Sequence, residues 1–343
     1  MDLAELSRVA KAMVAPGKGI LAADESGGTI KKRFTAIGVE STETSRRDYR
    51  ELLFRSAKAM ANRISGVILF DETIRQKAED GNSLVKVIEQ AGSIPGIKVD
   101  KGTKPLPFSP GETITEGLDG LRERLAEYHK LGARFAKWRA VITIADGCPT
   151  ANCVKANAHA LARYAALCQE QGLVPIVEPE VLMDGPHSAH DIDRCYTVTE
   201  WVLKTQFNEL YDAGVALEGM VLKPNMVIAG QKSAKQASAA EVAERTLRCL
   251  RATVPAAVPG IAFLSGGQSD QAATEHLSLM NALGPHPWAL TFSYGRALQA
   301  AALKAWGGKP ENTAAGQRAF SHRAKMNSLA ASGKWTKALE KAA

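Results

Sequence analysis

The chain has 343 residues, 45% hydrophobic and 23% charged, and a length that suits one large α/β barrel or two average domains. It lacks an apolar run of about 18 residues and a secretory signal, and its five scattered cysteines indicate reduced thiols, so we expect a cytoplasmic protein without a membrane partner. The net charge of +7 comes from basic residues spread along the chain, which favours a small anionic ligand over nucleic acid.

Short runs rich in Val, Ile, Leu and Phe recur along the chain and have the length of strands. A first helix precedes them, because Leu3, Leu6, Val9 and Met13 share one helical face. The predicted strands cover residues 19–24, 66–72, 94–100, 135–142, 173–182, 218–227, 260–267 and 288–294.

The segments between these runs have the apolar spacing of amphipathic helices. The predicted helices cover residues 47–62, 117–131, 157–171, 193–213, 239–252, 269–283 and 297–306. Residues 307–343 are rich in Ala and Lys and predict a helical tail beside or over the preceding elements. We therefore expect a single domain over residues 1–343, with its barrel at about 17–306.

Alternating strands and helices predict a parallel sheet, and eight repeats predict its closure into a (β/α)₈ TIM barrel. A doubly wound open sheet is the rival fold. It would be favoured by a glycine-rich dinucleotide loop after the first strand, but LAADESGGT lacks the GxGxxG pattern.

A barrel gathers its functional side chains at the carboxyl ends of several strands. Charged residues stand at or near those ends, although charge inside an apolar strand is costly unless it is paired or functional. They include Asp24, Glu25, Asp71, Glu72, Lys98, Asp100, Lys137, Arg139, Glu178, Glu180, Lys223 and Arg296.

Three lysines, Lys98, Lys137 and Lys223, are expected to face one cavity, and their mutual repulsion disfavours three positive charges. Lys223 lies in the most apolar of the three strands, so we expect it to be the neutral amine. A neutral amine can attack a carbonyl carbon and form a Schiff base. The alternative is a buried lysine that only pairs with a carboxylate.

Two acids on the fifth predicted strand can supply the proton that Schiff-base formation needs. Glu178 and Glu180 are two residues apart, so both point to the same side of the strand. Neighbouring carboxyl groups split their pKa values, which leaves one protonated near neutral pH as a general acid. They could equally be counter-ions of the lysines, and Asp24 is a second candidate base.

Loops after strands seven and eight of such barrels commonly bind phosphate. Ser265, Gly266 and Gly267 follow the seventh predicted strand, and Arg296 follows the eighth. A second anion site is expected after strand one, from Ser26, Thr29, Arg33 and Lys98. His187 and His190 form an HxxH pair without a third ligand of matching type, so we expect a solvated loop and no metal site.

Several motifs resemble those of class I fructose-bisphosphate aldolases, in the same order. They are LAADES, GIKVDKG, FAKWR, LVPIVEPEVL, LEGMVLKPNMV, FLSGGQS and WALTFSYGRALQ. The resemblance runs from about Leu3 to Trp306. It implies a cofactor-free, metal-free barrel that cleaves fructose 1,6-bisphosphate to dihydroxyacetone phosphate and glyceraldehyde 3-phosphate, and it suggests a homotetramer.

The resemblance also implies a role for each residue. Lys223 would form the Schiff base, Glu178 would be the main proton donor and acceptor, and Glu180 would support the lysine. Asp24 and Lys137 would act on the C4 hydroxyl. One phosphate would bind Ser265, Gly266, Gly267, Ser293, Gly295 and Arg296, and the other would lie near Arg33, Ser26, Thr29 and Lys98, with Arg139 in the same substrate-binding set.

One departure from the family concerns the end of the chain. Many members end in a Tyr that aids protonation of the enamine, whereas the last aromatic residue here is Trp335. We expect that step to be slower, or to depend on another residue or on water.

Two other functions remain open at this point. One is the same chemistry on another phosphorylated ketose, such as sedoheptulose 1,7-bisphosphate or fructose 1-phosphate, or a transaldolase-like transfer. The other is a catalytically silent scaffold, which the presence of Lys223, Glu178 and Asp24 together disfavours.

Overall fold

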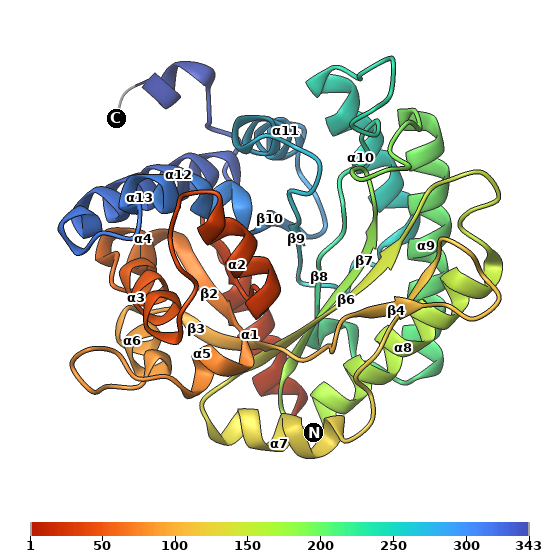
Figure 1. Ribbon diagram of the computed structural model, residues 1–343. Coiled ribbons are helices and arrows are strands. Elements are labelled where there is room, and N and C mark those ends of the chain that lie inside the picture. Colours follow the sequence, from red (N-terminus) through yellow and green to blue (C-terminus); the bar gives the residue numbers. More distant parts are fainter. Residues whose placement is uncertain (1, 342–343) are drawn as a thin grey trace.

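The structure, a computed structural model, describes residues 2–341, and within them eight parallel strands close into a barrel (Figure 1). This arrangement confirms the predicted (β/α)₈ fold. The strands follow one another around the barrel in chain order, and β10 pairs with β1 to close it. They are β1 (Gly19–Ala23), β2 (Ile64–Leu69), β3 (Ile94–Lys98), β6 (Phe135–Ile142), β7 (Val174–Val181), β8 (Val221–Leu222), β9 (Gly260–Phe263) and β10 (Ala289–Tyr294).

Helices surround the barrel, and several begin at a residue whose side chain caps free backbone N–H groups. Thr150, Asp191, Ser238 and Ser269 each accept such a bond at the start of α8, α9, α10 and α11. The α-helices are α1 (Leu3–Met13), α2 (Gly27–Thr35), α3 (Glu43–Phe54), α4 (Ala57–Arg63), α5 (Asp71–Arg75), α6 (Leu84–Gln90), α7 (Leu121–Lys130), α8 (Ala151–Glu170), α9 (Ile192–Asp212), α10 (Ala239–Thr253), α11 (Asp270–Ala282), α12 (Arg296–Trp306) and α13 (Thr313–Ala330). Short 3₁₀ turns are η1 (Leu217–Gly219), η2 (Pro310–Asn312) and η3 (Lys337–Lys341).

The structure differs from the sequence-based elements in several places. The helix predicted over 47–62 is two helices, α3 and α4, because the chain leaves helical geometry at Ser56. The sixth strand is much shorter than predicted: Lys223 N still bonds to Val177 O at 2.8 Å, but the next residue, Pro224, has no N–H to continue the ladder. Helices α2, α5 and α6 and the hairpin of β4 (Thr103–Pro105) and β5 (Thr113–Thr115) were not predicted.

Apolar side chains fill the lower part of the barrel. Helix α1 closes this end from below (Figure 1). One apolar cluster joins the inward side chains of several strands to one face of α1. Its members are Leu6, Val9, Ala10, Met13, Val14, Ile20, Ala22, Ile68, Phe135, Val174, Ile176, Val221 and Ala262. The interior is therefore a packed core rather than a channel, and ligands must enter from the opposite end.

Phe135 occupies much of this lower layer because neighbouring strands present glycine to it. A Cβ on Gly96 would lie 2.2 Å from the Phe135 ring, closer than any side chain can approach. Above this layer the same inward positions become charged, with Lys137 two residues after Phe135 and Glu178 two residues after Ile176. The period-two geometry of a strand thus stacks charged groups directly on apolar ones.

The end of the described chain packs on the barrel helices. Helices α12 and α13 lie side by side, and α13 also contacts α11 (Figure 1). The η3 turn is fixed by Glu340, which accepts hydrogen bonds from Arg323 Nη1 at 2.6 Å and Trp335 Nε1 at 2.9 Å. Among residues 2–341, no helix is both long and apolar enough to cross a membrane.

Candidate active site

Four charged side chains from four strands meet inside the upper end of the barrel. Lys137 Nζ lies 2.9 Å from Asp24 Oδ2 and 3.1 Å from Glu178 Oε2, and Lys223 Nζ lies 3.2 Å from Glu178 Oε1. All four side chains are nearly buried, with exposed fractions between 4% and 12%. Glu178 therefore bridges the two lysines, and the structure brings together the residues that the sequence placed at separate strand ends.

The pKa values of the two lysines of this cluster are shifted in opposite directions. Burial lowers the pKa of Lys223, and the positive charge of Lys137 adds to that effect against the opposing pull of Glu178. Burial also disfavours charge on Lys137, but its two carboxylate neighbours, Asp24 and Glu178, outweigh that effect and raise its pKa. The pKa of Lys223 is therefore lowered and that of Lys137 raised, which is consistent with Lys223 as the amine that loses its proton more readily.

The pKa values of the two acids Asp24 and Glu180 are also shifted in opposite directions. Burial would raise the pKa of Asp24, but Lys137 and Lys223 hold it well below its usual range. Burial raises the pKa of Glu180, and the 2.9 Å contact with Arg139 Nη1 offsets this only in part. The carboxyl group that burial favours in its protonated form is thus Glu180, whereas the family resemblance gives the main proton role to Glu178.

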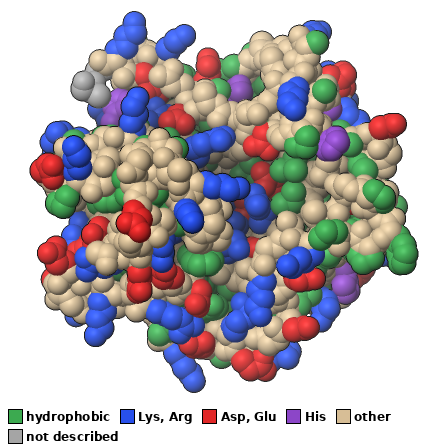
Figure 2. All heavy atoms as spheres, in the orientation of Figure 1, with side chains coloured by type: hydrophobic (Ala, Val, Ile, Leu, Met, Phe, Trp, Pro, Cys, Tyr) green, Lys and Arg blue, Asp and Glu red, His purple; other side chains and the backbone are tan. Residues whose placement is uncertain are grey.

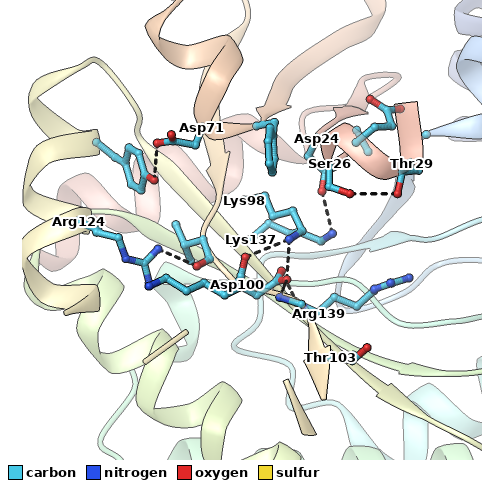
Figure 3. A pocket seen from close by; sticks show the side chains of 18 of the residues that line it. Asp24, Ser26, Thr29, Asp71, Lys98, Asp100, Thr103, Arg124, Lys137 and Arg139 are labelled. Carbon is cyan, nitrogen blue, oxygen red and sulfur yellow. Dashed lines mark hydrogen bonds and ion pairs between the residues drawn. The ribbon is translucent and has the colours of Figure 1, made fainter. Parts of the chain in front are cut away.

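A cavity of about 820 Å³ opens beside Asp24 and Lys137 of this cluster, whereas Glu178 and Lys223 are not among the residues that line it. Figure 2 shows Lys and Arg side chains around the hollow. Eight of the predicted site residues line it: Asp24, Ser26, Thr29, Arg33, Lys98, Lys137, Arg139 and Gly295. Figure 3 shows the hydroxyl groups of Ser26 and Thr29 facing each other across 3.2 Å on one side of the cavity. On another side Lys98 pairs with Asp100 at 2.6 Å.

Several residues of the cavity wall were missed by the sequence-based reasoning. Arg75 and Arg124 come from α5 and α7, and Arg124 donates to the Val99 carbonyl at 2.9 Å. The sequence analysis selected charged residues at or near the ends of predicted strands, and these two arginines lie on helices. Glu25 also belongs to the wall; it was noted as a strand-end charge but given no role.

The glycine-rich loop after β9 lies beside the buried acids. Gly267 has a φ of +72°, and a Cβ there would lie 2.3 Å from Met183, so only glycine fits. A Cβ on Gly266 would lie 3.0 Å from Glu180 Oε1. On the neighbouring strand β10, the buried Ser293 hydroxyl has no hydrogen-bond partner, which is typical of a group that binds a ligand.

Arg296 lies apart from the cavity in this structure. It lines a separate hollow of about 490 Å³ together with Gln268, Ser269, Asp270, Gln271, His322, Arg323 and Glu340. The neighbouring Gly295 lines the main cavity. Residues 295 and 296 therefore stand on two sides of the start of α12, and the predicted pairing of Arg296 with Ser265–Gly267 around one phosphate is not seen.

Histidine and cysteine do not form a metal site in the described part of the chain. Among residues 2–341 no group of three or more His, Cys, Asp or Glu side chains has the arrangement of a metal centre. The five cysteines are free thiols, and four of them are buried.

Comparison with known proteins agrees with this geometry. A family model described as fructose-bisphosphate aldolase class-I matches residues 5–343. A probable fructose-bisphosphate aldolase class 1 of Xanthomonas campestris pv. campestris is 59% identical over 98% of this chain and 99% of its own length. A fructose-bisphosphate aldolase of Drosophila melanogaster is 55% identical over 96% of this chain and 91% of its own.

A solved structure extends the similarity to three dimensions. The fructose-bisphosphate aldolase of Plasmodium falciparum, solved with TRAP and a small-molecule inhibitor, is 51% identical and superposes with a TM-score of 0.94. The match covers 97% of this chain and 96% of that one. Because family model, relatives and fold agree over nearly the whole length, the chain belongs to the class I fructose-bisphosphate aldolase family.

Proposed function

We propose that this chain cleaves fructose 1,6-bisphosphate through a Schiff base on Lys223, and that the residues of the buried cluster carry out the proton transfers. The observation that carries the proposal is the environment of Lys223. It is a buried amine with a lowered pKa, and a carboxylate lies 3.2 Å away to receive its proton. These are the conditions under which a lysine attacks a carbonyl carbon.

In the first step, Lys223 transfers a proton to Glu178 and its nitrogen attacks C2 of the open-chain ketose. The carbinolamine then loses its hydroxyl group as water, and Glu178 returns the proton to that leaving group. The product is a protonated iminium. The same carboxyl group thus acts first as base and then as acid, and it needs no outside proton.

In the second step, the C4 hydroxyl loses its proton and the C3–C4 bond breaks. Asp24 is the proposed base, and Lys137, which donates to it at 2.9 Å, stabilises negative charge at the reacting oxygen. The bonding electrons move to the iminium and leave an enamine, while glyceraldehyde 3-phosphate departs. Protonation of the enamine at C3 and hydrolysis then release dihydroxyacetone phosphate.

The two phosphates are proposed to bind two sets of residues around this cluster. Ser265, Gly266, Gly267, Ser293 and Gly295 provide hydroxyl and backbone groups for one, and Arg33, Ser26, Thr29 and Lys98 provide them for the other. The unpartnered Ser293 hydroxyl supports the first site. For Arg296 to join it, the side chain must turn from the outer hollow towards Gly295.

Borohydride trapping tests the assignment of Lys223. The protein is mixed with dihydroxyacetone phosphate, reduced with sodium borohydride and mapped by peptide mass spectrometry. We expect an adduct on Lys223 that disappears in Lys223→Met and persists in Lys304→Met, which removes a lysine from α12. An adduct on another lysine, or none in the unaltered protein, would contradict the mechanism.

Substrate preference is tested by steady-state kinetics. We expect kcat/KM to be higher for fructose 1,6-bisphosphate than for fructose 1-phosphate, because Ser26, Thr29, Arg33 and Lys98 surround the place proposed for the second phosphate. Sedoheptulose 1,7-bisphosphate is the third substrate to compare. Equal values for fructose 1,6-bisphosphate and fructose 1-phosphate would mean that this side of the cavity binds no phosphate.

We also propose that the chain is a single cytoplasmic folding unit that assembles into a homotetramer. The relative from Arabidopsis thaliana is named a cytosolic aldolase. Trp201 and Tyr211 are exposed on α9, with exposed fractions of 38% and 84%, and offer apolar surface for a subunit contact. Light scattering should give four times the chain mass, cell fractionation should place the protein in the cytosol, and unfolding should show one transition.

A further inference from the structure

Glu25 is a buried carboxylate that has no role in the mechanism above. It follows Asp24 at the end of β1, and its side chain is only 4% exposed. Oε1 accepts hydrogen bonds from Arg33 Nη1 and, at 2.9 Å, from Gln299 Nε2. Burial of a carboxylate costs free energy unless its partners compensate the charge fully. The position of Glu25 beside the cavity therefore indicates a functional role.

Two of the partners fix Glu25 from the protein interior. Arg50 Nη2 lies 3.5 Å from Glu25 Oε2 and donates to the Glu25 carbonyl oxygen at 3.0 Å. Gln299 Nε2 also donates to the Ala22 carbonyl. The Arg50 and Gln299 side chains are each about 1% exposed and come from α3 and α12, so Glu25 is held by elements that pack against the core.

The third partner, Arg33, faces the cavity. Its side chain is 27% exposed and lines the same wall as Ser26, Thr29 and Lys98. Its Nη2 lies 3.7 Å from where a Cβ on Gly295 would stand, so the guanidinium rests against a residue without a side chain. Glu25 thus binds Nη1, while Nη2 lies beside Gly295, another residue of the cavity lining.

A long, flexible arginine loses rotamer freedom when it binds a phosphate, and a fixed carboxylate removes much of that loss in advance. The negative charge of Glu25 could instead repel the phosphate. It is shared, however, by two guanidinium groups, so the set of Glu25, Arg33 and Arg50 keeps a net charge of +1. For phosphate binding, the gain from a fixed Arg33 should therefore outweigh the repulsion between Glu25 and the phosphate.

We propose that Glu25 is a positioning residue for substrate binding: it fixes the Arg33 guanidinium so that its free edge meets a substrate phosphate. The proposal rests on the proposed function, because it needs a phosphorylated substrate in this cavity. In this proposal Glu25 acts through Arg33 and not on the reacting atoms.

The test compares Glu25→Gln, which keeps the shape and removes the charge, with Arg33→Met and the double variant. For fructose 1,6-bisphosphate, Glu25→Gln should raise KM by about tenfold, the effect of losing one charge-assisted hydrogen bond. Its kcat should stay within about twofold, since the chemistry lies elsewhere. The double variant should show the KM of Arg33→Met and no more, because both changes remove the same contact.

Glu72→Gln is the matched control. It breaks a comparable carboxylate pair with Arg46, outside the main cavity, and should leave KM unchanged. If Glu25→Gln fails to fold, Glu25→Asp keeps the charge but shortens the reach, and it should raise KM in the same direction by a smaller factor. That increase should likewise vanish in the presence of Arg33→Met.

An unchanged or lowered KM would overturn the proposal, and so would KM increases that multiply in the double variant. A fall in kcat at constant KM would also overturn it, because Glu25 would then act on Asp24 instead. Borohydride trapping of the unaltered protein separates this outcome from failure of the proposed function. If no adduct is trapped on Lys223, the proposed Schiff-base mechanism is refuted. If the adduct is trapped but Glu25→Gln leaves KM unchanged, only the role of Glu25 is refuted.

Discussion

Replacement of Lys137 by Met should change the pH at which Lys223 becomes reactive. Lys137 and Lys223 contact the two oxygens of one carboxylate, at 3.1 and 3.2 Å. Methionine fills a similar volume but removes the positive charge. Because that charge helps to lower the pKa of Lys223, its loss should raise this pKa and keep the amine protonated at higher pH.

The size of the effect follows from the geometry. Two unit charges about 6 Å apart, as this bridge implies, repel by about 3 kcal/mol at an effective dielectric constant near 20. One pKa unit corresponds to about 1.4 kcal/mol, so the loss of this repulsion is large enough to raise the pKa of Lys223 measurably. The fraction of unprotonated amine at a given pH below the midpoint should then fall.

The assay is the rate of Schiff-base formation with dihydroxyacetone phosphate, trapped by borohydride at a series of pH values. This ligand has no C3–C4 bond to break, so the direct role proposed for Lys137 in cleavage does not enter. Lys98→Met is the matched control. Lys98 lines the same cavity but pairs with Asp100 at 2.6 Å, whereas Lys137 shares Glu178 with Lys223.

We expect the midpoint of the pH profile to move to higher pH in Lys137→Met and to stay in place in Lys98→Met. The reasoning is refuted if the midpoint in Lys137→Met is unchanged or moves to lower pH. Burial alone would then set the proton affinity of Lys223, and the charged neighbour would be irrelevant to it.

Three further predictions concern stability. Gly96→Ala places a methyl group 2.2 Å from the Phe135 ring, so urea unfolding should show a loss of about 2 kcal/mol that Phe135→Leu partly restores; equal stability would contradict the packing described. Burial lowers the pKa of His276 to about 4, below the value of about 6.5 in an unfolded chain, so the unfolded state binds this proton more tightly. Stability should fall as pH drops from about 6.5 to 4, and His276→Gln should remove about 3 kcal/mol of that fall; parallel curves for both proteins would argue against it. Glu340→Ala leaves the buried Arg323 without its carboxylate, which should cost about 3 kcal/mol and speed tryptic cleavage at the lysines of η3; unchanged cleavage would show that other contacts hold the tail.

The barrel and its central cluster could be predicted from the sequence because both follow from local pattern. Apolar runs of strand length identify the strands, and closure of the sheet brings their ends together whatever the intervening helices do. Asp24 and Lys223 directly follow their strands, whereas Lys137 and Glu178 lie inside β6 and β7; all four were found as charged residues in or next to apolar strands.

Other features depend on contacts between distant parts of the chain. Glu25 and Gln299 are 274 positions apart, and nothing near either residue indicates that they touch. The outward direction of Arg296 depends on how the tail packs beside α11, which no strand pattern specifies. The short sixth strand is a local effect that could have been foreseen, because Pro224 cannot donate a backbone hydrogen bond.

Along β6, apolar and charged side chains follow one another with the same period on the inward face. The register of this one strand therefore positions both the apolar core and the charged residues of the site. Loss of a single residue between Phe135 and Lys137 would turn every later side chain of the strand through half a turn. Lys137 and Arg139 would then face the apolar helix layer, and the core would lose its packing at the same moment. Length changes in this family should therefore collect in the connecting loops, such as the β4–β5 hairpin, and be absent from β6 and β7.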